Sequence, residues 1–198
     1  IELLNDAGVV AFSPDGKSIV SARIGDSLKL LDLSGKGLKT FDERFSENVF
    51  FPDEKSLLTI GAGIGGSSAK LWDIKSKEIK SIREYFLQSH VLVADCSNDG
   101  KYLLTSGFDN TTKLWSTATG QNLATLIALD SADWVVTTPS GLFDASPGAM
   151  KLMHYVQGLE VIELEQLKER YYEPGLLAKI MGFDKDELRN VAAFDNVA

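Results

Sequence analysis

A unit of about forty residues recurs along this 198-residue chain, and it limits the possible folds more than any other feature. Each copy carries a lysine–leucine landmark, which is found at residues 28–32, 69–73 and 112–116. The spacing is regular: Leu31 precedes Trp72 by 41 positions, and Trp72 precedes Trp115 by 43. A fixed period of this length predicts an array of one supersecondary unit.

A tight turn precedes each landmark. The turns lie at residues 12–17, 51–55 and 96–101, and two of them contain Asp-Gly. Proline fixes φ and glycine supplies the positive φ that such turns require. Short apolar runs with polar residues between them lie on both sides. Each unit therefore reads as four short β-strands joined by turns.

The period and the landmarks resemble the WD40 repeat over about residues 1–129. The resemblance implies an all-β fold, a WD40-type β-propeller. It also implies a non-catalytic scaffold for protein–protein interaction. In that family an aspartate before the tryptophan strand joins a buried polar network, a role that Asp109 matches with Ser106 or Thr105 as its hydroxyl partner. The structural positions that the resemblance assigns are Asp109, Trp115, Trp72, Asp73 and Ser106.

A fourth, atypical unit follows residue 130. It has the apolar run 134–136, a Thr-Pro-Ser-Gly turn at 138–141, and residues 151–155 where the landmark would stand. We expect three clear blades and this degenerate one over residues 1–162, with residues 1–4 as an outer strand of a preceding blade. The ring is then part of a larger propeller, a small closed ring, or one completed by self-association.

Residues 163–198 have helical rather than alternating spacing and are predicted to form a short α-helical tail or connector. Helices are expected over residues 163–172, 175–181 and 184–191. Tyr171, Tyr172 and Arg170 give one helix face a mixture of aromatic and charged groups, which is common at protein interfaces. The alternative is that these side chains dock the tail onto the last blade.

Residues 134–146 and 167–177 resemble a segment of large bacterial WD40 proteins, where it lies between the propeller and a caspase-like peptidase or another effector. The resemblance implies a regulatory or sensor segment of such an effector as the alternative function. A caspase-like site needs a His–Cys pair. The chain has one cysteine, Cys96, and two histidines, His90 and His154, so the catalytic part is expected to lie elsewhere.

The segment 61–66, Gly-Ala-Gly-Ile-Gly-Gly, matches the spacing of a dinucleotide-binding loop. Such a site needs a helix to begin there, whereas the residues that follow are the strand of the second landmark. We therefore predict a hairpin loop, and a nucleotide-dependent enzyme remains the third and weakest alternative.

Other chemistry-bearing residues favour structural roles. Cys96 is expected to be a small buried hydrophobe. Trp134 and Phe143 are expected in core or closure packing rather than in a ligand stack, because aromatic residues dominate cores. The acidic residues Glu160, Glu163 and Glu165 are expected to solvate the start of a helix, where negative charge is favourable.

The charge pattern bears on partners. The net charge is −8, the isoelectric point is about 4.8, and basic residues are scattered singly. Nucleic-acid binders cluster lysine and arginine, so we predict protein or peptide partners and neither nucleic acid nor membrane. A single cysteine excludes an internal disulfide and a cysteine metal cluster, so we expect no cofactor and a cytoplasmic location.

Overall fold

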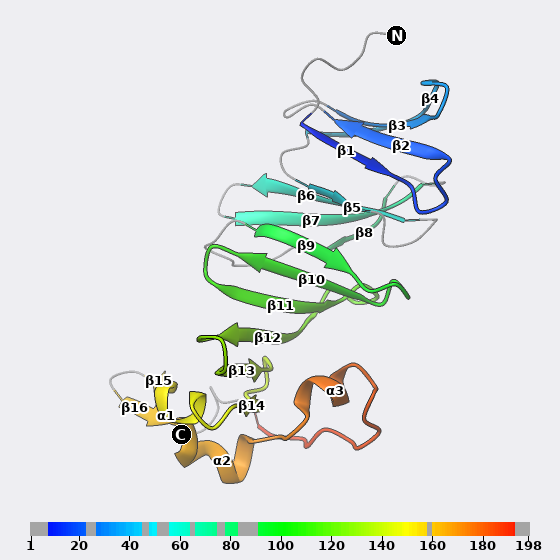
Figure 1. The fold of residues 1–198 in the computed structure, drawn as a ribbon. Coiled ribbons are helices and arrows are strands. Elements are labelled where there is room, and N and C mark those ends of the chain that lie inside the picture. The colour runs from blue at the N-terminus through cyan, green and yellow to red at the C-terminus, as the bar shows by residue number, and fades with distance from the viewer. Residues whose placement is uncertain are drawn as a thin grey trace. The chain divides into compact units, whose positions relative to one another are not determined.

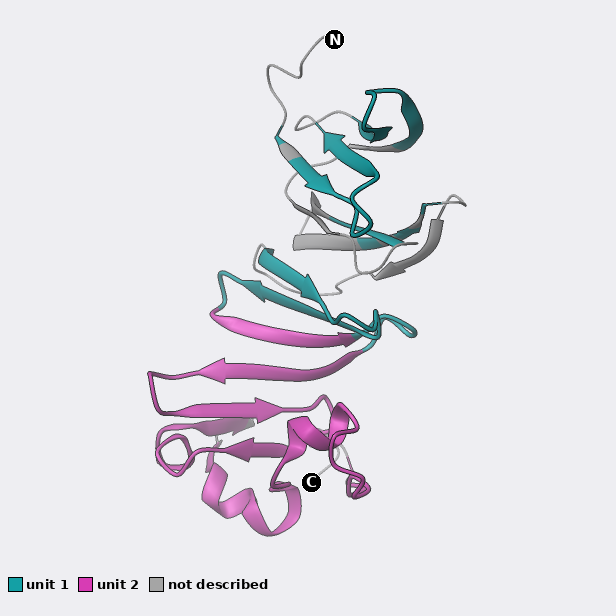
Figure 2. Cartoon of the chain, turned by 45° about the vertical axis from the view of Figure 1, so that its right-hand side comes forward, with its two compact units in different colours: residues 1–109, 116–121 teal, residues 110–115, 122–198 magenta. Residues whose placement is uncertain are grey.

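The computed structural model describes residues 8–22, 27–44, 48–50, 56–63, 66–74, 78–82, 91–157 and 160–192. The chain divides into unit 1, residues 1–109 and 116–121, and unit 2, residues 110–115 and 122–198 (Figure 2). Antiparallel sheets dominate both units, and the described helices are short. The prediction of an all-β fold of the WD40 propeller type is confirmed.

Unit 1 contains two four-stranded meanders and the first hairpin of a third repeat (Figure 1). In both meanders, strands that are consecutive in the chain are neighbours in the sheet. Their alignment confirms the repeat register, because the lysine–leucine landmark falls in the third strand each time. The strands are β1 (Val9–Phe12), β2 (Ser18–Ala22), β3 (Ser27–Asp32), β4 (Gly37–Arg44), β5 (Asn48–Phe50), β6 (Ser56–Gly63), β7 (Gly66–Asp73), β8 (Glu78–Ile82), β9 (Val91–Cys96) and β10 (Tyr102–Gly107).

The first and third repeat turns use the same hydrogen bonds. In the third, the Ser97 hydroxyl donates to Asp99 Oδ1 at 2.7 Å, and the Lys101 amide donates to the same oxygen at 3.1 Å. Ser13, Asp15 and Lys17 repeat this pattern in the first turn. The Ser97 hydroxyl and then the Lys101 amide lower the pKa of Asp99 to about 2. The middle turn at 51–55 lies outside the described residues.

The glycine-rich segment 61–66 belongs to a hairpin. Strands β6 and β7 pair in register as far as Gly63 opposite Gly66, and residues 64–65 are outside the described part. A strand, β7, begins at Gly66 where a dinucleotide site would require a helix. The hairpin prediction is confirmed at both strands.

The core of unit 1 joins its two meanders. Phe41 of the first and Trp72 of the second meet edge to face, with ring centroids 5.4 Å apart. The Trp72 indole Nε1 donates to Thr59 Oγ1 at 3.0 Å, which satisfies two buried polar groups at once. In the first repeat Leu31 stands at the tryptophan position, and among the described residues the buried Ser21 hydroxyl has no hydrogen-bond partner.

Unit 2 starts with four strands in the order β14-β13-β12-β11. They are β11 (Thr111–Ser116), β12 (Asn122–Ala128), β13 (Trp134–Thr137) and β14 (Phe143–Ala145). The Thr-Pro-Ser-Gly turn joins β13 to β14, as predicted, with Gly141 at φ 94°. Strand β13 pairs directly with β12, so the atypical fourth unit extends an existing sheet.

The expected landmark strand at residues 151–155 is wrong. These residues span the end of α1 (Ala149–Leu152) and the start of β15 (His154–Gln157), which pairs with β16 (Glu160–Glu163). The reason lies at Ser146, whose hydroxyl accepts the amides of Ala149 and Trp134 and donates to Asp133. These bonds turn the chain out of the sheet directly after β14.

Two of the three predicted tail helices are present: α2 (Leu164–Tyr171), with Glu163 and Gln166 in a capping box, and α3 (Leu176–Ile180). The third, predicted at 184–191, is wrong, because the described residues there are irregular. Tertiary contacts prevail over the local helical preference. Arg189 is drawn to Glu173, and Val191 packs against the core of unit 2.

Candidate binding groove

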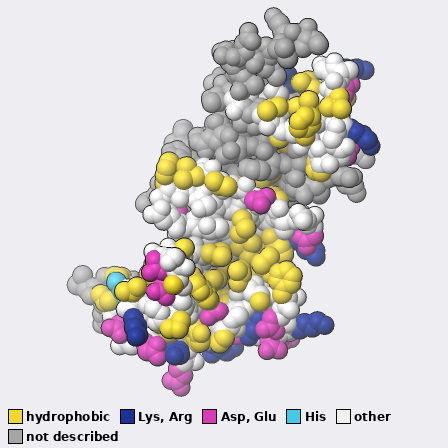
Figure 3. Space-filling view, viewed as in Figure 1, with side chains coloured by type: hydrophobic (Ala, Val, Ile, Leu, Met, Phe, Trp, Pro, Cys, Tyr) yellow, Lys and Arg dark blue, Asp and Glu magenta, His cyan; other side chains and the backbone are white. Residues whose placement is uncertain are grey.

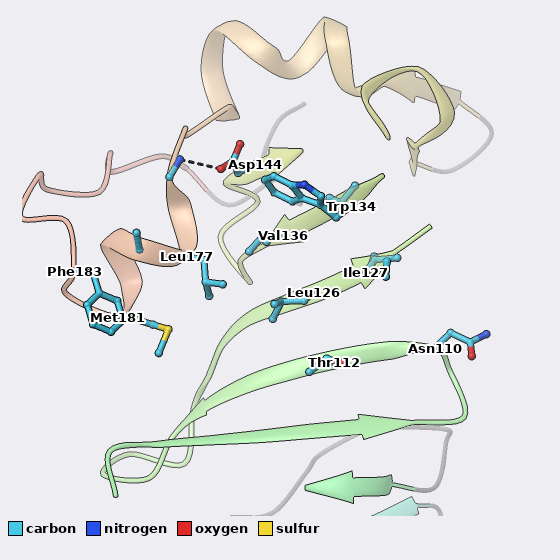
Figure 4. A pocket seen from close by; sticks show the side chains of 14 residues that line it. Asn110, Thr112, Leu126, Ile127, Trp134, Val136, Asp144, Leu177, Met181 and Phe183 are labelled. Atoms are coloured by element: carbon cyan, nitrogen blue, oxygen red, sulfur yellow. Dashed lines mark hydrogen bonds between the residues drawn. The ribbon is translucent and has the colours of Figure 1, made fainter. Parts of the chain in front are cut away.

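The side chains of β12–β14 alternate between two faces, and the faces have different neighbours. On one face Val135, Phe143 and Ala145 are buried against α1 and α2. On the other face lie Leu126, Trp134, Val136 and Asp144 (Figure 4). Strand alternation therefore gives this sheet a closed core on one side and a lined hollow on the other.

The hollow is an apolar groove of about 760 Å³ between the sheet and α3, wholly within unit 2. Leu177 of α3 and Met181, which directly follows α3, extend into the groove opposite Leu126 and Val136 of the strands (Figure 4). Its volume lies in the usual range for binding clefts. The full lining is Asn110, Thr112, Leu126, Ile127, Ala128, Trp134, Val135, Val136, Asp144, Gly175, Leu177, Ala178, Met181 and Phe183.

Trp134 corrects an expectation from the sequence. It was predicted to lie in core or closure packing, but 42% of its surface is exposed at the groove, whereas Phe143 is fully buried as predicted. Because Trp134 and Val135 are neighbours on one strand, only one of them can face the core. Val135 occupies that face.

Asp144 is the charged group of the groove floor, and its oxygens are occupied. Oδ2 accepts the Gly175 amide at 2.9 Å, and Oδ1 accepts the Ala145 amide at 3.0 Å. Burial, and then the charge of Asp144 and a hydrogen bond to it, raise the pKa of the Tyr172 hydroxyl. This carboxylate thus fixes the start of α3 against the sheet, a role that Gly175 permits by adopting φ 70°.

Glu173 anchors the other side of the α3 wall. Its side chain is 6% exposed and forms ion pairs with Lys179, on α3, and with Arg189 Nε at 2.7 Å. Burial acts to raise the pKa of Glu173, but the hydrogen bonds and charges of Lys179 and Arg189 outweigh burial and lower it. The Glu173 amide also donates to the Phe143 carbonyl at 2.8 Å, so one residue ties the sheet both to α3, through Lys179, and to the segment after α3, through Arg189.

The residues assigned by the WD40 resemblance are not among those that line the groove. Trp72 and Trp115 are buried, and Asp109 is exposed in the turn between β10 and β11. The Trp72 indole donates its hydrogen bond to Thr59. The residue equivalent to Thr59 in the third repeat is Thr105, which is also buried, whereas Ser106 is half-buried. The alternation favours Thr105 over Ser106 as the hydroxyl of that repeat. Asp73 lies in β7, and its side chain is outside the described part.

The proposed interface of Tyr171, Tyr172 and Arg170 is largely internal. Tyr171 is 1% exposed, and its hydroxyl donates to the Ala192 carbonyl at 3.3 Å. Tyr172 is half-buried against Phe143, with ring centroids 5.6 Å apart. Both tyrosines therefore dock the tail, and only Arg170 remains exposed.

The remaining chemistry-bearing residues do not assemble a reactive centre in the described part of the chain. Cys96 is half-buried at the end of β9, His154 is exposed on β15, and His90 lies outside the described residues. Across the described ranges, no three His, Cys, Asp or Glu side chains are grouped to hold a metal ion. Within those ranges, no helix has the length and apolar content needed to cross a bilayer.

Sequence reasoning missed the α3 side of the groove. The signal was available in Leu177, Ala178 and Met181, whose helical spacing puts them on one stripe. The sequence predicts a helix there, over residues 175–181, but not what its apolar stripe faces. The position of α3 over the sheet depends on the hydrogen bond between Asp144 and Gly175. These residues are far apart in sequence, so no local pattern predicts the bond.

Comparison with known proteins gives one family match and several relatives. Residues 80–116 match the family described as WD domain, G-beta repeat. The chain is similar to the LEC14B protein of Lithospermum erythrorhizon, at 30% identity over 54% of the chain and 24% of the relative. It is also similar to the U3 small nucleolar RNA-associated protein 15 homolog of Gallus gallus, at 29% identity over 79% of the chain and 29% of that protein.

The chain thus carries a WD40 repeat and spans about a quarter of the length of the curated relatives that it matches. A LEC14B homolog from Prunus armeniaca, 31% identical over 112 residues, gives the same picture. These relatives come from plants and a bird, and their names specify neither a peptidase nor another enzyme.

Proposed function

We propose that this chain is a non-catalytic protein-interaction module and that it holds a protein partner in the groove between β11–β13 and α3. The groove carries the proposal: it is apolar, partly open, and built from one compact unit. Exposed apolar surface of this kind marks interaction sites. Repeat folds such as this one also commonly serve as scaffolds.

Site-specific cross-linking from within the groove tests the proposal. A photoreactive phenylalanine analogue replaces Met181, which lines the groove, and in a matched variant it replaces Leu152, which is 63% exposed on α1 outside the groove. In extracts of the source cells, the Met181 variant is expected to cross-link to a discrete protein and the Leu152 variant is not.

Two results would overturn the proposal. Equal cross-linking from both positions would show that the groove has no special affinity for protein. A small molecule found in the groove by native mass spectrometry of protein from source cells would instead make the chain a small-ligand carrier.

A second candidate is the regulatory or sensor segment of a larger bacterial effector with a caspase-like peptidase. The segments that resemble such proteins, 134–146 and 167–177, supply opposite sides of the groove through Trp134 and Leu177. The groove would then be the point at which the effector senses its ligand. The sequence of the complete gene decides: a product without a downstream His–Cys domain removes this candidate.

We also expect the module itself to bind protein rather than nucleic acid. One relative carries RNA association in its name, but here acidic residues outnumber basic ones. A labelled single-stranded RNA should show no saturable change in anisotropy at physiological salt. Saturable binding would transfer the RNA association of that relative to this chain.

A further inference from the structure

We infer that the occupant of the groove is an amphipathic α-helix with basic residues beside its apolar stripe. The inference rests on the proposed function and names the class of partner. It follows from three properties of the groove: its largely apolar lining, the charge at its rim, and the construction of its α3 wall.

The lining leaves a bound backbone without hydrogen-bond partners over most of its length. Leu126, Val136, Leu177 and Met181 are apolar, and the Asp144 carboxylate already accepts the Gly175 and Ala145 amides. The other polar side chains of the lining, Asn110 and Thr112, both lie at its β11 side. An extended peptide would bury unsatisfied N–H and C=O groups there, at substantial cost. An α-helix satisfies its own backbone and presents apolar side chains at i, i+3 and i+4, which suits an apolar groove.

The rim beside α3 is acidic. Asp184 follows the lining residue Phe183, and its carboxylate lies 3.9 Å from the position that a Cβ on Gly175 would occupy. Asp186 and Glu187 follow and are exposed. The exposed Lys185 lies among them, and the two other basic residues nearby, Lys179 and Arg189, are both paired with Glu173.

The sheet side of the rim has the same sign. Asp130 is exposed in the turn that leads to Trp134, whereas the Asp133 carboxylate is turned toward Ser146, whose hydroxyl donates to it at 2.7 Å. Figure 3 shows apolar side chains gathered on this face, with acidic and basic side chains around them. Lysine or arginine beside the apolar stripe of a partner would complement both sides of the groove.

The same charges disfavour a second copy of this chain as the occupant. The net charge is −8, so two copies repel each other, and an acidic rim would meet an acidic surface. The negative charge of this chain attracts a basic partner, whereas it repels a second acidic copy.

The α3 wall can adjust to a helix of variable shape. Gly175 and Gly182, at φ 70° and 76°, bound the five-residue α3 (Leu176–Ile180). Met181 lines the groove, and the flexible methionine side chain fits surfaces that accept different partners.

Three synthetic peptides test the class of partner by fluorescence anisotropy. The first is a labelled helix of about 18 residues, or five turns, with leucine at i, i+3, i+4 and i+7 and lysine beside them. The second has glutamate in place of lysine, and the third has two central prolines. We expect saturable binding of the lysine peptide and at least tenfold weaker binding of the other two.

Variants of the protein locate the binding. Met181→Ser is expected to lower the affinity for the lysine peptide by about tenfold, because one apolar contact is lost. The control Leu152→Ser, at an exposed position outside the groove, should change this affinity less than about twofold. The double change Asp184→Asn with Asp186→Asn should weaken binding several-fold at low salt and less at high salt. In that pair the amide oxygen at 184 can still accept the backbone hydrogen bond of residue 186.

Each contrary result overturns a stated part of the inference. Equal binding of the glutamate peptide removes the basic flank, and equal binding of the proline peptide removes the helix. Dimerisation that Met181→Ser abolishes would make a second copy the occupant. If no peptide binds while Met181 still cross-links to a protein, the inference fails and the proposed function stands; if Met181 and Leu152 cross-link alike, the proposed function itself fails.

Discussion

The two faces of β12–β14 carry similar apolar side chains but are covered differently. On the closed face Phe143 and Val135 are sealed by α1 and α2, and Tyr172 forms a bridge to Phe143. On the open face Trp134 and Val136 lie opposite the five-residue α3 and the Met181 and Phe183 side chains that follow it, and the groove remains between them. The comparison shows that alternation places apolar side chains on a face, whereas the length and anchoring of the covering segment decide whether that face becomes core or binding surface.

The largest expected effect separates the two faces directly. Phe143→Ala should lower the free energy of unfolding by about 3–5 kcal/mol, because a fully buried ring is removed from a packed core. Trp134→Ala should cost less, about 1–2 kcal/mol, because 42% of the residue is already exposed. Urea denaturation of both variants measures the difference, and similar losses would show that the open face is as structural as the closed one.

The next effect concerns the anchor of the wall. Glu173→Gln should destabilise the fold by about 1–3 kcal/mol, since it leaves Lys179 without its partner charge; the partly exposed Arg189 limits the loss. Hydrogen exchange of the α3 amides should accelerate more than exchange in β13. Uniform acceleration would mean that α3 is not a separate covering element.

The same anchor predicts a pH dependence. The pKa of Glu173 lies below its ordinary value of 4.5 in the folded chain. Its contribution to stability is therefore complete above about pH 4.5 and is lost as the pH falls through the lowered value. Wild type and Glu173→Gln should differ in stability at pH 7 and converge in acid; a difference that persists to the lowest pH would assign the effect to packing.

The smallest expected effect lies where the two faces meet. Tyr172→Phe removes a hydroxyl hydrogen-bonded to Asp144 and should cost about 1 kcal/mol. Asp144→Asn should bring the pKa of Tyr172 back toward 10, because it removes the negative charge that contributes to raising that pKa. Ultraviolet titration of the phenol checks this, and an unchanged pKa would leave burial as its whole cause.

Prediction from sequence succeeded where contacts repeat. The landmarks at Leu31, Trp72 and Trp115 fall in the third strand of their repeats, because turn and strand signals are local and recur at a fixed period. The sequence also shows leucine in place of tryptophan at position 31. It does not show the consequence: the buried Ser21 hydroxyl, which is equivalent to Thr59, has no indole to bond and lacks a partner in the described chain.

Prediction failed where one contact joins distant residues and occurs once. The bond between Asp144 and Gly175 and the pair between Glu173 and Arg189 place α3 over the sheet and keep residues 184–191 from forming a helix. Neither contact has a periodic signature. The groove, which depends on both, could not be derived from the repeat that identified the fold.

The small size of α3 (Leu176–Ile180) has a consequence in time. A helix of five residues is not stable alone, so its order depends on the Asp144–Gly175 bond and the Lys179–Glu173 pair. When these break, the helix can detach while β12–β14 stay folded, because the closed face does not depend on it. We therefore expect this wall to detach and return many times within the lifetime of a single folded molecule.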